Sequence, residues 1–209
     1  MVKARKKKCA VFLVGGMTLF LLALLYLPAC SPRPYQIKRA EVLYNKGQIL
    51  ETKGHLDEAL TKFNESIALA EKAGFRPGVA NNLNEIAIIA TNRGEFMRAR
   101  ELFTRALGIY KEMGLNSDVS KSLNNIALTY LKELDFEGAL KEYRELLQWD
   151  KETGNLLGNV ITLNNMGFIY ERYLGRAEEA RRTYREALEI AGQLGNRKYI
   201  ELLRKKLED

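Results

Sequence analysis

Few side chains in this sequence have the type and spacing that catalysis or metal binding requires. The 209 residues contain one histidine, His55, and two cysteines, Cys9 and Cys30. No serine or cysteine has an obvious basic partner in the sequence, which also lacks a glycine-rich phosphate loop and a metal-spaced cluster. We expect His55 to be a surface turn residue, because it lies between two segments with helical periodicity. The sequence therefore predicts a protein that is not an enzyme and has no catalytic residue, metal or cofactor.

Cys30 is the residue for which the sequence indicates a chemical reaction. A basic stretch leads into an uncharged apolar run over residues 9–29, and Leu27-Pro28-Ala29 precede Cys30 directly. This arrangement resembles the lipobox of bacterial lipoprotein signal peptides, in which the cysteine is lipidated and becomes the mature N-terminus. The resemblance implies a signal peptide at residues 1–29. It also implies that residues 30–35 are a lipidated cysteine, carrying palmitate, and a short linker.

The apolar run has a second interpretation, an uncleaved anchor helix. Its roughly 20 residues could span a bilayer core of about 30 Å. In either case the basic end stays in the cytoplasm and the rest of the chain faces outward. Ser31, rather than an aspartate, follows the cysteine, which by the same resemblance favours the outer membrane. We therefore expect the chain in the bacterial cell envelope, lipid-anchored and facing the periplasm.

The excess positive charge is concentrated in the N-terminal segment. The formal net charge of +7, taken alone, suggests an acidic partner such as nucleic acid. Five basic residues precede the apolar run, however, which leaves 28 of the 33 basic side chains against 26 acidic ones. A nearly neutral domain lacks the electrostatic footprint of a nucleic-acid-binding protein, so we predict no nucleic-acid partner.

The strongest pattern in the sequence is an internal repeat of about 40 residues. In each unit a leucine is followed by a glycine or alanine four residues later, and then by an alanine and an aromatic residue further on. Apolar residues at i, i+3, i+4 and i+7 within a unit indicate two amphipathic helices. The recurring residues are Leu43, Leu83, Leu123 and Leu163; Gly47, Ala87, Ala127 and Gly167; Ala59, Ala99, Ala139 and Ala180; and Phe63, Phe103, Tyr143 and Tyr184.

These residues resemble the signature of the tetratricopeptide repeat family, in the subclass whose first helix reads Leu-Asn-Asn followed by an apolar and a small residue. Residues 123–127 and 163–167 carry that signature in full. The resemblance implies an all-α fold: an α-solenoid of four tetratricopeptide-type helix pairs of about 40 residues each plus a C-terminal capping helix. We place this domain at residues 36–209, with repeats at about 40–79, 80–119, 120–159 and 160–196 and the cap at 197–209.

In this family the first helix of each pair lines the concave surface, so the resemblance implies a partner-binding groove on these helices. Asparagine recurs there although it is a poor helix former, and its amide can match the donors and acceptors of a peptide backbone. Alternatively, the asparagines bond between neighbouring helices and fix the superhelix. Exposed apolar residues in the groove favour binding, unless the chain's own tail or a second copy covers them. The predicted groove residues are Tyr44, Asn45, Asn84, Ile88, Lys121, Asn124, Asn125, Leu128, Asn164, Asn165 and Phe168.

The function that follows is a membrane-anchored scaffold or adaptor that docks a partner peptide or helix in its groove, as in envelope complex assembly. One alternative is a peptide-sensing regulatory module whose superhelix closes on its ligand. Another is an uncleaved single-pass membrane protein with the same outward-facing repeats. A homo-oligomer is compatible with each of these functions.

Overall fold

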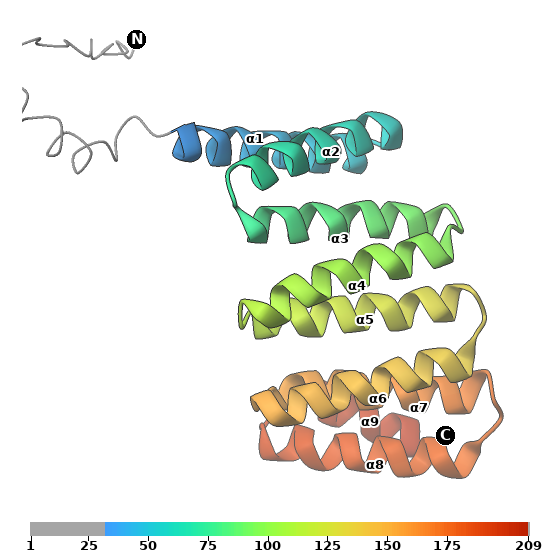
Figure 1. Cartoon of the computed structure of the whole chain (residues 1–209). Coiled ribbons are helices and arrows are strands. Elements are labelled where there is room, and N and C mark those ends of the chain that lie inside the picture. Colours follow the sequence, from blue (N-terminus) through green and yellow to red (C-terminus); the bar gives the residue numbers. More distant parts are fainter. Residues whose placement is uncertain (1–31, 209) are drawn as a thin grey trace, which may run out of the picture. The chain divides into compact units, whose positions relative to one another are not determined.

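The structure is a computed structural model that describes residues 32–208, and this part of the chain is entirely helices and short turns. The helices of this part are shown in Figure 1. They confirm the all-α solenoid that the repeat pattern predicted. Their bounds are α1 (Pro32–Thr52), α2 (Leu56–Lys72), α3 (Arg76–Asn92), α4 (Phe96–Glu112), α5 (Asn116–Lys132), α6 (Phe136–Thr153), α7 (Leu156–Arg172), α8 (Ala177–Gln193) and α9 (Arg197–Glu208).

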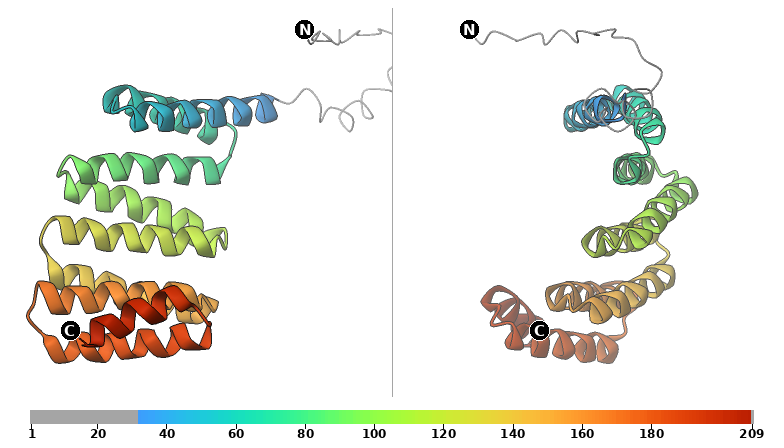
Figure 2. Two further views of the ribbon diagram at one scale, coloured as in Figure 1. Left: turned by 180° about the vertical axis from the view of Figure 1, so that it is seen from behind. Right: turned by 60° about the vertical axis from the view of Figure 1, so that its left-hand side comes forward.

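The helices form four antiparallel pairs, and α9 closes the stack. The first helix of each pair (α1, α3, α5 and α7) lies on one side of the stack, as the right-hand view of Figure 2 shows. Each later first helix packs against the second helix of the preceding pair, and α9 packs against α8. Leu203 of α9 is fully buried, so this helix covers the apolar end of the last pair as expected of a cap.

The core of each pair depends on a small residue of the first helix facing an aromatic ring of the second. A Cβ atom added to Gly47 would lie 2.5 Å from Cε1 of Phe63, and one added to Gly167 would lie 2.4 Å from Cε1 of Tyr184. The helices can approach this closely only because the small residue leaves room for the ring. The recurring glycines and alanines are therefore packing residues.

The turn inside each pair contains a residue in the left-handed backbone region, directly before the N-cap of the second helix. Gly54, Gly94 and Gly175 have φ angles of 79°, 78° and 64°. In the third pair this position is Leu134, with φ of 65°. A side chain at such a φ costs about 1–2 kcal/mol, so this turn is strained relative to its three counterparts.

The domain starts earlier than the sequence predicted. Residues 32–35, which we expected to belong to a linker, form the first turn of α1. Pro32 and Pro34 are compatible with this turn because its backbone N–H groups have no acceptor within the helix. The later pairs begin about four residues before the expected repeat bounds, at Arg76, Asn116 and Leu156, since the opening turns lack the apolar periodicity from which those bounds were drawn.

The membrane predictions concern the other end of the chain. The signal peptide at residues 1–29 and the lipidated Cys30 lie outside the described residues and stay predictions. Within residues 32–208, no helix combines the length and the apolar composition that crossing a bilayer requires.

Candidate partner-binding groove

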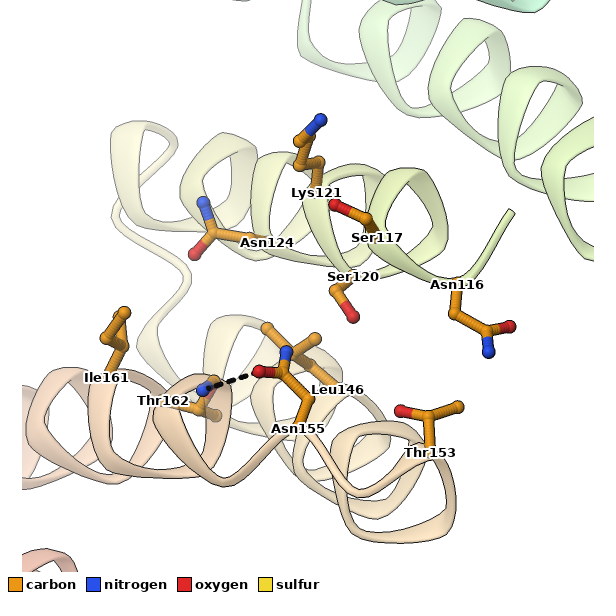
Figure 3. A pocket seen from close by; sticks show the side chains of 11 residues that line it. Asn116, Ser117, Ser120, Lys121, Asn124, Leu146, Thr153, Asn155, Ile161 and Thr162 are labelled. Carbon is orange, nitrogen blue, oxygen red and sulfur yellow. Dashed lines mark hydrogen bonds between the residues drawn. The ribbon is translucent and has the colours of Figure 1, made fainter. Parts of the chain in front are cut away.

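One hollow on the side of the first helices lies between α5 and α7. We refer to it as the α5–α7 cavity, and its volume is about 460 Å³. In Figure 3, Ser120 points toward Asn155 across this cavity, whereas Lys121 points away from α7. Amides and hydroxyls make up most of the lining, with two aliphatic side chains among them. The lining residues are Asn116, Ser117, Ser120, Lys121, Asn124, Leu146, Thr153, Asn155, Gly158, Ile161 and Thr162.

A buried carboxylate fixes two of these lining residues. Asp150 of α6 is 1% exposed, and its Oδ1 accepts hydrogen bonds from Ser120 Oγ at 2.6 Å and from Asn155 Nδ2 at 2.9 Å. Asn155 is also the N-cap of α7, where its Oδ1 accepts from the backbone N–H of Gly158 at 3.0 Å. Three helices thus meet in one hydrogen-bond network, which holds this wall of the cavity in place.

A second hollow of about 250 Å³ lies among α1, α3 and α5, and we refer to it as the α1–α5 cavity. The Tyr44 hydroxyl donates to Glu85 Oε1 at 2.7 Å and accepts from Gln48 Nε2 at 3.0 Å. Burial, together with the adjacent Glu85, raises the pKa of Tyr44, which therefore stays protonated and acts as a donor. The lining residues are Tyr44, Asn81, Asn84, Glu85, Tyr110, Asp118 and Lys121.

The structure brings four of the predicted groove residues into these two cavities. Tyr44 and Asn84 line the α1–α5 cavity, Asn124 lines the α5–α7 cavity, and Lys121 lines both. The Lys121 ammonium forms an ion pair with Asp118 of the same helix, 2.9 Å away, and remains mostly exposed. The two cavities therefore adjoin at Lys121 and together form one stretch of surface.

Two of the predicted asparagines bond to each other between neighbouring helices, one of the two roles that the sequence left open. Asn125 Nδ2 donates to Asn84 Oδ1 at 3.3 Å, a link between α5 and α3 that braces neighbouring pairs. Asn45 is exposed on α1, and Asn164 is half-buried on α7. Asn165 adjoins the hydroxyl of Tyr143, whose pKa burial raises to about 12.

The predicted apolar residues also divide. Leu128 and Phe168 are each 40% exposed, whereas Ile88 packs against the core. Phe168 lies edge-on to Tyr173, with 5.7 Å between ring centroids, and the Lys206 ammonium of α9 lies 5.6 Å from its centroid. The capping helix therefore approaches this end of the predicted groove.

Sequence reasoning missed several residues of the site. Ser120, Asn155 and Ile161 were absent from the prediction, as was Asp150 behind the wall. The sequence did contain a clue to Asp150. In the register of the repeats it corresponds to Ala70, Tyr110 and Ala191, so the third repeat has a carboxylate where the other repeats have buried alanine or tyrosine. Within the described residues, His, Cys, Asp and Glu side chains form no group suited to hold a metal ion.

The chain is similar to solved structures of other helical repeat proteins. It resembles aspartyl phosphate phosphatase F from Bacillus subtilis at 12% identity and a TM-score of 0.71, over 81% of this chain and 44% of that one. For the apo form of RapI the identity is 16% and the TM-score 0.66, over 88% of this chain and 65% of that one. For the Rap conjugation gene regulator of plasmid pLS20 in complex with the Phr* peptide, the identity is 19% and the TM-score 0.59. This match covers 88% of this chain and 49% of that one.

The chain spans less than two thirds of the length of each of these proteins, and at such identities the likeness concerns the fold. The comparison with curated proteins found no similar sequence. The profile of a family described as tetratricopeptide repeat matches residues 38–112 and 118–196, which is well over half of the chain. Together with the four helix pairs, this match shows that the chain belongs to the tetratricopeptide repeat family.

Proposed function

We propose that this chain is a membrane-tethered binding protein that holds a protein or peptide segment along the α1–α5 and α5–α7 cavities. The observation that carries the proposal is the pair of adjoining cavities, about 250 and 460 Å³ in volume, that share Lys121. Most of their polar groups are neutral amides and hydroxyls, which suit the alternating donors and acceptors of a peptide backbone.

The geometry also provides for side chains of the partner. Ile161 in the α5–α7 cavity and Leu128 nearby on α5 are more than a third exposed, so each could contact an apolar side chain. Ser120 and Asn155 are held by Asp150, which lowers the conformational entropy that binding would cost. A peptide as the partner is supported by the solved structure of the pLS20 regulator, a similar fold in complex with the Phr* peptide.

The membrane tether rests on the sequence before the described residues. Leu27, Ala29 and Cys30 are the basis for lipidation, and the apolar run is the basis for attachment in either interpretation. A scaffold in envelope complex assembly is the role that this placement favours. If Cys30 carries the lipid, the chain should incorporate labelled palmitate in a lipoprotein-competent bacterium, and Cys30→Ser should abolish the label. A mature mass that includes residues 1–29 without lipid would instead support the uncleaved anchor.

A photoreactive residue in the groove tests the binding proposal. Benzoylphenylalanine at Ile161 of the full chain in its membranes should crosslink to a partner, because this residue lines the α5–α7 cavity. The control position is Met97, which is 80% exposed on α4. Equal crosslinking at both positions, or none at Ile161, would contradict binding in the groove.

A peptide-sensing regulator is the second candidate, and the regulatory role named for the pLS20 protein favours it. Scattering separates the two functions. A sensor should become more compact when it binds its peptide, whereas a scaffold should keep its radius of gyration. The phosphatase named for another similar structure is matched over only 44% of its length, so we propose no such activity here.

A further inference from the structure

The first helix has an outward face that the repeat architecture leaves uncovered. Three large apolar residues of α1 are at least half exposed: Tyr35 (65%), Val42 (60%) and Ile49 (55%). At 100° per residue, their spacing of seven places all three along one side of the helix. Together with Lys38, Arg39 and Lys46 they form one stripe, which we term the α1 outer face.

The register of the repeats shows why this face is exposed. Val42 corresponds to Asn82, Ser122 and Thr162, all of which are at most 2% exposed. In α3, α5 and α7 this side of the helix packs against the second helix of the preceding pair. Within the described residues no pair precedes α1, so its equivalent face is left without a partner.

The composition of the α1 outer face differs from that of its buried counterparts. Lys46 stands where the other pairs have Ile86, Ile126 and Met166, which are no more than 6% exposed. Val42 is apolar where the other pairs bury the polar residues Asn82, Ser122 and Thr162. Ile49 is apolar as well, although a solvated end of a solenoid favours polar residues. The face is thus neither a core surface nor an ordinary solvated one, but a mixture of basic and apolar side chains.

The acidic residues of α1 project elsewhere. Glu41 lines a small cavity with Tyr44 and Asn82. Burial raises the pKa of Glu51, and the neighbouring carboxylate of Glu85 on α3 raises it further. A hollow of about 490 Å³ lies on the outer face, and its lining residues are Tyr35, Lys38, Arg39, Val42, Leu43 and Lys46. The outer face presents Lys38, Arg39 and Lys46, and none of the described residues that line its hollow is a carboxylate. Glu41, three residues after Lys38, lies beside this face.

We propose that the α1 outer face lies on the membrane surface, with its basic side chains on anionic phospholipid headgroups and its apolar side chains inserted between them. Basic flanks around apolar residues are typical of interfacial helices, and tyrosine is enriched at this depth. A second copy of the chain fits less well, because two such basic faces would repel each other. This proposal rests on the membrane tether proposed above, and its test separates the two.

The position of the tether supports this occupant. Cys30 precedes the start of α1 by two residues, which reach at most about 7 Å even when extended. The 21-residue helix is about 32 Å long, so a tether at one end alone would let it pivot away from the membrane. Contact along the outer face would fix α1 against the lipid and thereby hold the groove in one orientation.

Quenching of a tryptophan by brominated lipid tests the proposal in the full chain. The only tryptophan, Trp149, is first replaced by phenylalanine, which loses no hydrogen bond because its buried Nε1 has no partner. Val42→Trp then reports on the outer face, and Met97→Trp, at an 80% exposed position of α4, is the matched control. Each chain is reconstituted into vesicles of phosphatidylcholine with or without phosphatidylglycerol, with bromine on the acyl chains.

We expect Val42→Trp to lose fluorescence in the anionic vesicles and Met97→Trp to keep it. Replacing Lys38, Arg39 and Lys46 by glutamine should remove the quenching while the chain still floats with the vesicles. Each basic residue near an anionic surface contributes about fivefold to binding, so the three together contribute on the order of 100-fold. High salt should reduce the quenching for the same reason.

Flotation with neutral vesicles reports on the tether, and quenching reports on the face. A chain that floats with either vesicle but shows no quenching of Val42→Trp would overturn the proposal and leave the tether intact. Blue-shifted emission without quenching would assign the face to a second copy or another part of the chain, which also overturns it. Quenching in anionic vesicles by a chain that does not float with neutral ones would support the face and refute the tether.

Discussion

Leu134 allows a stability prediction whose magnitude follows from the backbone. Its φ of 65° places it in the left-handed region, which costs a residue with a side chain about 1–2 kcal/mol. Glycine avoids this cost but loses about 0.4–1 kcal/mol through the greater entropy of the unfolded chain. The side chain is 70% exposed, so its removal sacrifices little packing. Leu134→Gly should therefore stabilise the folded chain by about 0.5–1 kcal/mol.

The preceding pair of helices offers the matched reversal. Gly94 occupies the same turn with φ of 78°, and a Cβ atom added there meets nothing within 4 Å. Gly94→Ala should therefore destabilise the fold by a similar amount through backbone strain alone. Leu134→Ala keeps the strain and should change stability little. From most to least stable, the expected order is thus Leu134→Gly, then the parent chain and Leu134→Ala, and last Gly94→Ala.

The measurement is denaturant unfolding of residues 32–209, followed by circular dichroism at the helical band. The midpoint should move while the dependence on denaturant stays constant, since the surface exposed on unfolding is unchanged. An unchanged or lower midpoint for Leu134→Gly would refute the reasoning, because it would show that the leucine side chain contributes more than the strain costs.

Three further predictions concern the groove and the core. Leu128→Ser combined with Phe168→Ser should abolish partner capture in a pull-down. The melting temperature should barely change, since both side chains are 40% exposed. A large drop in melting temperature would mean that they are core residues. A double-mutant cycle of Asn84→Ala and Asn125→Ala should give a coupling of about 0.5–1.5 kcal/mol from their hydrogen bond, and additive effects would argue against this brace. Ala139→Arg should cost roughly 3 kcal/mol or more in urea unfolding, because Ala139 is 0% exposed between paired helices, and unaltered stability would place this position on the surface.

The fold could be predicted because its packing rule is local and repeated. A small residue precedes an aromatic residue by 16 positions in the first three pairs and by 17 in the fourth, where Gly167 faces Tyr184. Four such copies identify the architecture. The start of α1 could not be predicted in this way. This turn contacts the domain through a polar group, since Arg33 Nε donates to the Ala73 carbonyl at 2.8 Å, and hydrophobic periodicity cannot report on such a contact.

The site was only partly predictable, because its side chains meet across helices. The side of the helix on which Lys121 and Asn124 lie follows from their positions relative to Leu123, and both do line the α5–α7 cavity. Whether an asparagine bonds to a neighbouring helix or stays available to a partner depends on the distance between its amide and the next helix pair. Asn125 lies within hydrogen-bonding distance of Asn84 in the structure, and the sequence gives no means of knowing that separation.

Residues that depart from the repeat pattern therefore indicate function more clearly than residues that follow it. Agreement at a position such as Leu83 is explained by packing, which every pair requires. Lys46 and Asp150 replace buried apolar or aromatic residues of the other pairs, and neither replacement is needed to fold a repeat. Asp150 is buried, and its Oδ1 accepts hydrogen bonds from Ser120 and Asn155. A carboxylate at this core position is best explained by the cavity wall that it fixes, just as Lys46 is best explained by a surface that the solenoid itself does not supply.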